Sequence, residues 1–149
     1  MMRRRQPSSK RGLRSVIEQK HFERIADGAT VRFKSDRSGL YWIILDGAEG
    51  ASGADIKRSV NDAFGWMFVN TDAFVLRGTI ADDNKQCLAM CPHFIGRLER
   101  GSEVHVFTST LARWAKVYGI EKAISEIRAA GQTVKADKLE AAAKAAGVI

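Results

Sequence analysis

Long apolar runs, cysteine and proline are all scarce in this sequence. The longest uninterrupted apolar run covers residues 40–45, whereas a membrane-spanning helix needs about 20 apolar residues and a signal-peptide core about 7–15. We therefore expect no membrane-inserted helix and a cytoplasmic localisation. Two cysteines exclude a disulfide-stapled scaffold, and two prolines with 13 glycines exclude collagen-like and low-complexity chains.

The remaining composition is typical of one globular domain. Apolar residues make up 45% of the 149 positions and charged residues 28%, and a chain of this length can bury a single core without staples. We find no internal repeat. The sequence therefore predicts one folded domain over residues 13–149.

Charge is unevenly distributed along the chain. The net charge is +7, and the first 14 residues contain no acid and six basic residues, which are Arg3, Arg4, Arg5, Lys10, Arg11 and Arg14. This leaves 18 of the 24 Lys and Arg for the rest of the chain, almost balanced by all 17 Asp and Glu. Residues 1–12 lack apolar periodicity, so we expect a disordered basic arm on a nearly neutral body.

The hydrophobic pattern of the body predicts an α+β fold. Near-helical spacing of apolar residues indicates an N-terminal helix at residues 13–26. Short strands separated by turn residues predict an antiparallel sheet over residues 31–108, interrupted by a short helix at residues 54–64 that ends at Gly65. Residues 110–146 read as a helical hairpin followed by an Ala-rich helix.

Basic residues on the predicted strands extend the candidate phosphate-binding set beyond the arm. Arg32, Lys34 and Arg77 fall on outward positions of the sheet. Aromatic residues on strands can stack on bases when they share such a face, although core packing explains most of them equally well. The candidates by sequence are Trp42, Trp66, Phe68, Phe74 and Phe107.

A glycine-rich string at residues 46–53 follows a buried strand and precedes a helix. This order resembles the first motif of methyltransferases and is typical of dinucleotide sites, because glycine lets a ligand approach the backbone. However, the glycines are spaced G-x-x-G-x-x-G, and the hairpins expected after Phe64 do not fit a parallel nucleotide-binding sheet. The string is interpreted as a connection, with an enzyme that uses this loop as the remaining alternative.

Two further patterns favour ordinary structure over function. Cys87, Cys91, His93 and His105 have the residue types of a zinc site, but His105 lies on a separate strand, and we predict no metal, cofactor or catalytic residues. Residues 111–131 resemble a helix-turn-helix, yet the apolar positions after Gly119 are shifted by one residue. A plain helical hairpin is the preferred interpretation.

The sequence therefore predicts a small, non-enzymatic nucleic-acid-binding protein. The arm would contact phosphates, and the α+β body would supply shape, with DNA and RNA, and single and double strands, left open. The alternative is a protein–protein adaptor or inhibitor that binds a partner, or a second copy, through the C-terminal helices or an apolar sheet face.

Overall fold

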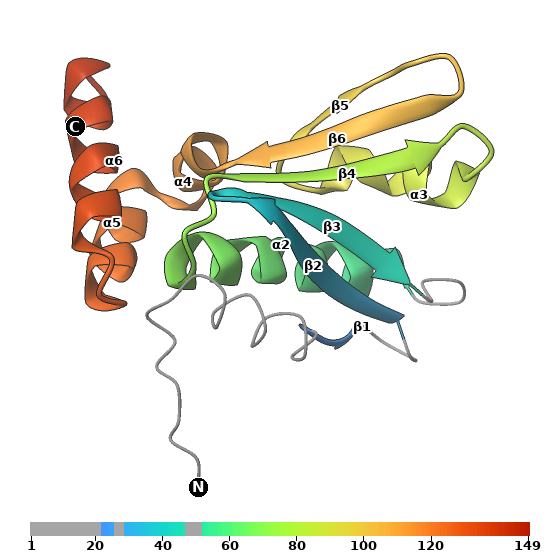
Figure 1. The fold of residues 1–149 in the computed structure, drawn as a ribbon, viewed down its shortest axis with the longest axis horizontal. Helices are drawn as coiled ribbons and strands as arrows, with labels where there is room; N and C mark the ends of the chain where they lie inside the picture. The colour runs from blue at the N-terminus through green and yellow to red at the C-terminus, as the bar shows by residue number, and fades with distance from the viewer. Residues whose placement is uncertain (1–21, 26–28, 47–51) are drawn as a thin grey trace, which may run out of the picture.

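The computed structural model describes residues 22–25, 29–46 and 52–149. Within them the chain forms an α+β fold, as the sequence predicts, built on one six-stranded sheet (Figure 1). The strand order is β1-β2-β3-β4-β6-β5, with bounds β1 Phe22–Ile25, β2 Ala29–Arg37, β3 Leu40–Asp46, β4 Val75–Ala81, β5 Arg97–Glu99 and β6 Val104–Thr110. The helices are α2 Gly53–Asn70, α3 Lys85–Met90, the 3-10 turn η1 Cys91–His93, α4 Leu111–Tyr118, α5 Ile120–Ala129 and α6 Thr133–Ala145.

The sheet is mixed, which corrects the expectation of a purely antiparallel sheet. β3 and β4 run parallel because α2 crosses over between them, and they pair from Leu40–Val75 to Trp42–Arg77. All other neighbouring strands are antiparallel. The sequence shows only the order strand, helix, strand. A helix as short as the predicted one does not decide between parallel and antiparallel pairing of the two strands.

The start of the chain also differs from the prediction. The expected helix at residues 13–26 lies mostly outside the described residues, but its end, residues 22–25, forms strand β1. β1 pairs antiparallel with the edge of β2, joining Phe22 to Val31 and Ile25 to Ala29. Pairing of backbone groups to a neighbouring strand outweighs the weak helical preference of this short segment.

Helix α2 is longer than its sequence signal. Ser52 caps its start by accepting a hydrogen bond from the backbone N–H of Asp55, and the helix runs through Gly65 as far as Asn70. Gly65 does not end the helix, because the indole of Trp114 packs where its Cβ would be, only 3.1 Å from Nε1. Residues 66–69, which fall within the region predicted to form the sheet, are therefore helical.

A second segment predicted as extended, residues 86–90, is also helical. Asn84 accepts a hydrogen bond from the backbone N–H of Cys87 through its side chain and so caps α3. Asn84 follows Asp82 and Asp83, and because such a run of Asp and Asn is typical of a turn, the sequence alone does not identify it as a helix cap.

The core lies between one face of the sheet and helices α2 and α3. Phe64 is at its centre and contacts the rings of Phe33, Phe94 and Phe107, with centroids 6.2 to 6.5 Å apart. Helices α4, α5 and α6 stand together at one end of the sheet (Figure 1). Leu139 of the Ala-rich helix α6 is buried within this core, so the apolar side of α6 is used internally. Within the described part of the chain, none of the helices has the length and apolar character needed to cross a membrane.

Candidate nucleic-acid interface

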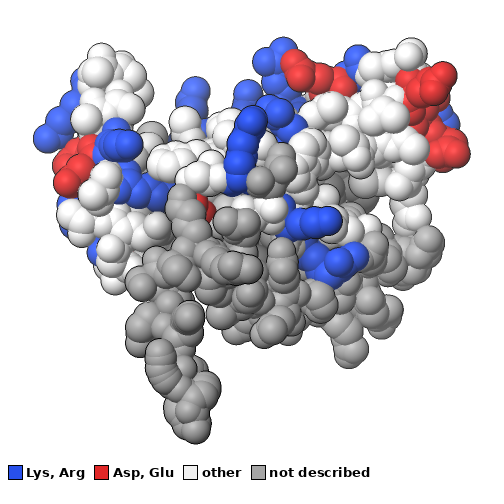
Figure 2. All heavy atoms as spheres, viewed as in Figure 1, with Lys and Arg blue, Asp and Glu red and all other residues white. Residues whose placement is uncertain are grey.

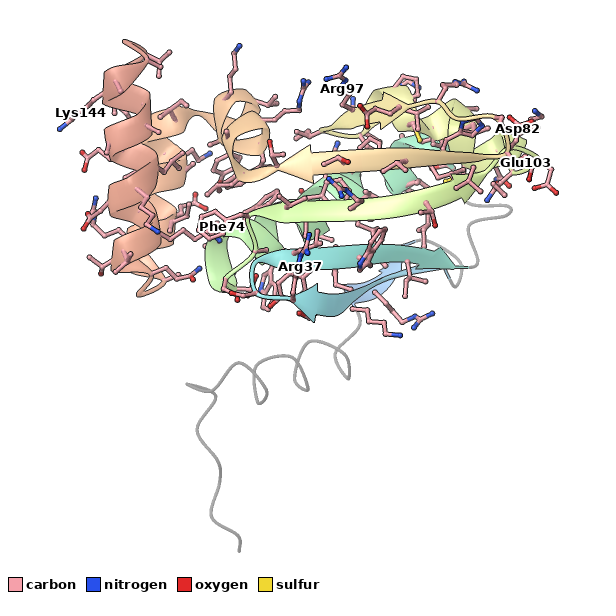
Figure 3. The ribbon with its side chains drawn as sticks, turned by 45° about the horizontal axis from the view of Figure 1, so that its top comes forward. Arg37, Phe74, Asp82, Arg97, Glu103 and Lys144 are labelled. Atoms are coloured by element: carbon pink, nitrogen blue, oxygen red, sulfur yellow. The ribbon has the colours of Figure 1, made fainter. Side chains whose placement is uncertain are left out.

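Within residues 22–25, 29–46 and 52–149, no helix covers the face of the sheet that points away from α2 and α3 (Figure 3). Along β4 and β6, buried residues alternate with more exposed ones, which places Arg77 and Thr108 on this open face and Leu76 and Phe107 in the core. Figure 3 shows the strands in front and α2 and α3 behind them. We call the outward side of β2 to β6 the open face.

A single row of residues crosses the open face over five strands. The register pairs Lys34 of β2 with Trp42 of β3, and Trp42 with Arg77 of β4. Arg77 pairs in turn with Thr108 of β6, and Thr108 with Arg97 of β5. At a strand spacing of about 4.8 Å, the row is roughly 19 Å long. It places one indole among three basic side chains, and Arg77 donates a 3.4 Å hydrogen bond from Nε to the Thr108 hydroxyl.

The rest of the open face carries described charges of both signs. Arg32 lies next to the row, paired with Ile44, and Glu99 is the acid on β5. In Figure 3, Arg37 and Arg97 lie at opposite sides of the face. Asp82 and Glu103 lie together where β4 ends and β6 begins. Figure 2 agrees: Lys and Arg atoms are spread over the middle of the view and most Asp and Glu atoms lie toward its margins.

The structure brings three of the nine predicted site residues together. Arg32, Lys34 and Arg77 share the open face. The six basic residues among residues 1–14, which are Arg3, Arg4, Arg5, Lys10, Arg11 and Arg14, lie outside the described residues. The predicted set lacked Arg97, since only the pairing of β5 with β6 shows that it continues the row.

Of the aromatic candidates, only Trp42 is placed to stack on a ligand at the row. It is half-buried and lies outside the hydrophobic core. Phe107 and Phe68 are core residues, Trp66 lies on α2, and Phe74 precedes β4 at the α6 end of the sheet (Figure 3). Of these candidates, the row therefore contains one indole, that of Trp42.

No family model, curated protein or solved structure matches this chain. A function therefore has to be argued from the geometry of its own residues.

The cysteines and histidines do not form a metal centre in the part of the chain that the structure describes, where no three His, Cys, Asp or Glu side chains lie close enough to hold an ion. His105 is buried, and both of its ring nitrogens have partners. Nδ1 accepts from the backbone N–H of Gly101 at 3.0 Å, and Nε2 lies 2.8 Å from Oδ1 of Asp82. The hydrogen bond with His105 lowers the pKa of the Asp82 carboxyl. His105 therefore ties the β5–β6 turn to the end of β4.

Helix α5 is not placed as a DNA-recognition helix. Arg128, which such a helix would expose, is bound by Asp137 at 2.8 Å and Glu140 at 3.2 Å, both on α6. Glu126 accepts a hydrogen bond from the hydroxyl of Tyr118. Since α6 packs along α5, the hairpin is a structural unit, in line with the preferred interpretation.

A small cavity lies where β3 and β4 separate. Beyond Trp42 and Arg77 the two strands no longer pair, and a cavity of about 120 Å³ opens under the gap. Residues of both strands, of α2 and of α3 line it, among them Ile43, Leu45, Ile80, Val60, Cys87 and Cys91. The unpaired edges are at the carboxyl ends of the parallel strands, and α2 begins at this same end.

Proposed function

We propose that the protein binds single-stranded nucleic acid on the open face of its sheet. The observation that carries this proposal is the row Lys34–Trp42–Arg77–Thr108–Arg97. Basic side chains on either side of an aromatic one can pair with successive phosphates while a base stacks on the indole. Stacking needs a base that is not already stacked in a duplex, which is why a single strand is favoured over a double strand.

The basic arm adds to this proposal as a second source of phosphate contacts. The six positive charges of residues 1–14 would extend the charged path beyond the row and make binding strongly dependent on salt. The arm remains a prediction, as does the cytoplasmic localisation.

Binding is best tested by fluorescence anisotropy with random-sequence single-stranded DNA and RNA and with a duplex, over a series of salt concentrations. For a single strand, each phosphate contact adds about 0.7 to the steepness with which the logarithm of the binding constant falls with the logarithm of the salt concentration. The triple variant Lys34→Gln, Arg77→Gln, Arg97→Gln should therefore reduce the slope by about 2 and weaken binding. Lys57→Gln on α2, an exposed lysine away from the open face, is the matched control and should leave both unchanged.

Trp42→Leu separates stacking from charge. Loss of one stacked base costs about 1–3 kcal/mol of binding, and this loss should be the same at low and high salt. If the triple variant and Trp42→Leu bind as tightly as Lys57→Gln, the open face is not the binding surface. Deletion of residues 2–14 tests the arm separately, and an unchanged salt slope would exclude it as a phosphate contact.

A second candidate function, favoured by the cavity, is binding of a small extended ligand between β3 and β4. In sheets with parallel strands, ligands bind outside the carboxyl ends of the strands, which is where this cavity opens. The unpaired strand edges could pair with the amide groups of a narrow ligand such as the pantetheine arm of coenzyme A. The hairpins expected from the sequence argued against a nucleotide-type site after β3, and the parallel pairing of β3 and β4 removes that argument.

A thermal-shift series with coenzyme A, acetyl-coenzyme A, S-adenosylmethionine and ATP tests this second candidate. A ligand at 100 times its Kd stabilises the folded state by about 2.7 kcal/mol, which raises the melting temperature measurably. No shift with any of the four would exclude this class of ligand and would leave the nucleic-acid proposal untouched.

A further inference from the structure

The two cysteines of the chain lie together on the wall of the cavity between β3 and β4. Cys87 belongs to α3 and Cys91 begins η1, and both line the cavity of about 120 Å³. Both thiols are free, and they differ in exposure: Cys91 is buried, at 3% exposed, whereas Cys87 is half-buried. A reagent that comes from solvent can therefore reach Cys87 before it reaches Cys91.

The turn between the two cysteines directs the Cys91 thiol back toward Cys87. The backbone N–H of Cys91 bonds to the carbonyl oxygen of Leu88, three residues earlier, so the helix tightens at its end. Sγ of Cys91 donates to the carbonyl oxygen of Cys87 at 3.4 Å, and the two thiols also share a hydrogen bond. The buried thiol is thus a hydrogen-bond donor beside the more exposed one.

This arrangement divides the two thiols into one thiolate and one thiol. The hydrogen bond from Cys91 lowers the pKa of Cys87 to about 7, although partial burial opposes it. The same hydrogen bond and burial raise the pKa of Cys91, and the charge of Arg100 opposes that rise in part. Near neutral pH the thiolate, which is the form that attacks disulfides, is therefore on the accessible cysteine.

The spacing of the two cysteines disfavours a disulfide between them. Side chains four residues apart on a helix have Cβ atoms about 5–6 Å apart, whereas a disulfide needs about 3.5–4.5 Å. The tightened turn before Cys91 increases the rise per residue further. Cys91 can therefore donate a hydrogen bond to the Cys87 thiolate, but it cannot bond to Cys87 without movement of the backbone.

The cavity limits what could be attached to Cys87. Its volume is well below the roughly 300–1,000 Å³ of sites that hold drug-sized ligands. The side chains of Ile43, Leu45 and Ile80 are part of its lining, so much of the wall is apolar. A short, unbranched aliphatic group fits such a space, and a branched peptide does not.

We propose that Cys87 exchanges with the disulfide of a short, unbranched low-molecular-weight thiol and holds that thiol in the cavity as a mixed disulfide. The Cys87 thiolate attacks one sulfur of R–S–S–R, a bond forms between Sγ and that sulfur, and the bond of the reagent breaks. The second half leaves as R–S⁻ and takes a proton from water, so the reagent itself is the oxidant. Cys91 acts as a positioning residue. The proposal rests on neither nucleic-acid binding nor coenzyme binding.

Incubation of the full chain with bis(2-hydroxyethyl) disulfide at pH 7, followed by mass spectrometry of the intact and digested protein, tests the proposal. We expect one hydroxyethylthio group, on Cys87. The disulfide of N-acetylcysteine amide is the matched reagent, since it is also neutral but branched. With each rate divided by the rate for the urea-unfolded protein, the short reagent should react at least tenfold faster. Equal ratios, preferential labelling of Cys91, or loss of two hydrogens to an internal disulfide would each overturn the proposal.

Variants of Cys91 test its positioning role. Cys91→Ser keeps a hydrogen-bond donor, so the pH at half-maximal rate should stay near 7. Cys91→Ala removes the donor, and the half-maximal rate should move toward the ordinary thiol pKa of about 8.5. The rate at pH 7 should then fall about threefold, because the more basic thiolate is scarcer but more nucleophilic. An unchanged pH profile in Cys91→Ala would overturn the role of Cys91, and Cys87→Ser should take up no label.

Discussion

Lys135 of helix α6 is buried against the end of α2, and its titration should control stability above neutral pH. Its side chain is 5% exposed, and Nζ donates to the carbonyl oxygens of Phe68 at 2.5 Å and Thr71 at 2.9 Å. Burial lowers the pKa of this amine to about 7, opposed in part by the nearby Asp72 carboxylate. A neutral amine still has two N–H groups, so both hydrogen bonds survive loss of the proton.

The sign of the effect follows from proton binding in the two states. Between pH 7 and the ordinary lysine pKa of 10.5, the unfolded chain keeps this proton and the folded protein has mostly lost it. The free energy of unfolding therefore rises with pH by about 1.4 kcal/mol per unit in this range, and by about 5 kcal/mol at most over the whole range. Well below pH 7 the contribution of Lys135 no longer changes, because both states are protonated.

Urea unfolding of the wild type and of Lys135→Met at pH 7, 8, 9 and 10 measures this effect. Methionine keeps a long unbranched side chain but cannot titrate, so the difference in unfolding free energy between the two proteins should grow with pH. Lys138→Met, an exposed lysine on the same helix, is the control and should give a constant difference. A difference for Lys135→Met that stays flat from pH 7 to 10 would refute the reasoning.

Three further predictions concern the core, a turn and the thiols. Phe64→Ala should lower the unfolding free energy by about 3–5 kcal/mol in urea titrations, because it leaves a cavity among three aromatic rings. Gly101→Ala should lower the melting temperature clearly, because its Cβ would lie 2.2 Å from the carbonyl oxygen of Val104; an unchanged melting curve would contradict this. Cys87 should react with iodoacetamide before Cys91, as read by mass spectrometry, since their hydrogen bond lowers the pKa of Cys87 and, together with burial, raises that of Cys91.

Local signals in the sequence were enough to predict the elements that are stabilised by residues close to one another in the chain. Helices α4, α5 and α6 follow from Thr110 as a cap, Gly119 as an interruption and the apolar spacing between them. Strand β3 follows from its apolar run, and the charge asymmetry of the chain is a property of composition alone. None of these depends on a distant partner.

Tertiary contacts decided the elements that these local signals did not predict. Strand β1 depends on the free edge of β2, and the continuation of α2 through Gly65 depends on Trp114, 49 positions along the chain. The sequence by itself determined which residues are basic and outward, including Arg32, Lys34 and Arg77. Only the pairing of five strands decided that Lys34, Trp42, Arg77, Thr108 and Arg97 stand in one row, because the register of a sheet is set by backbone partners that lie far apart in the chain.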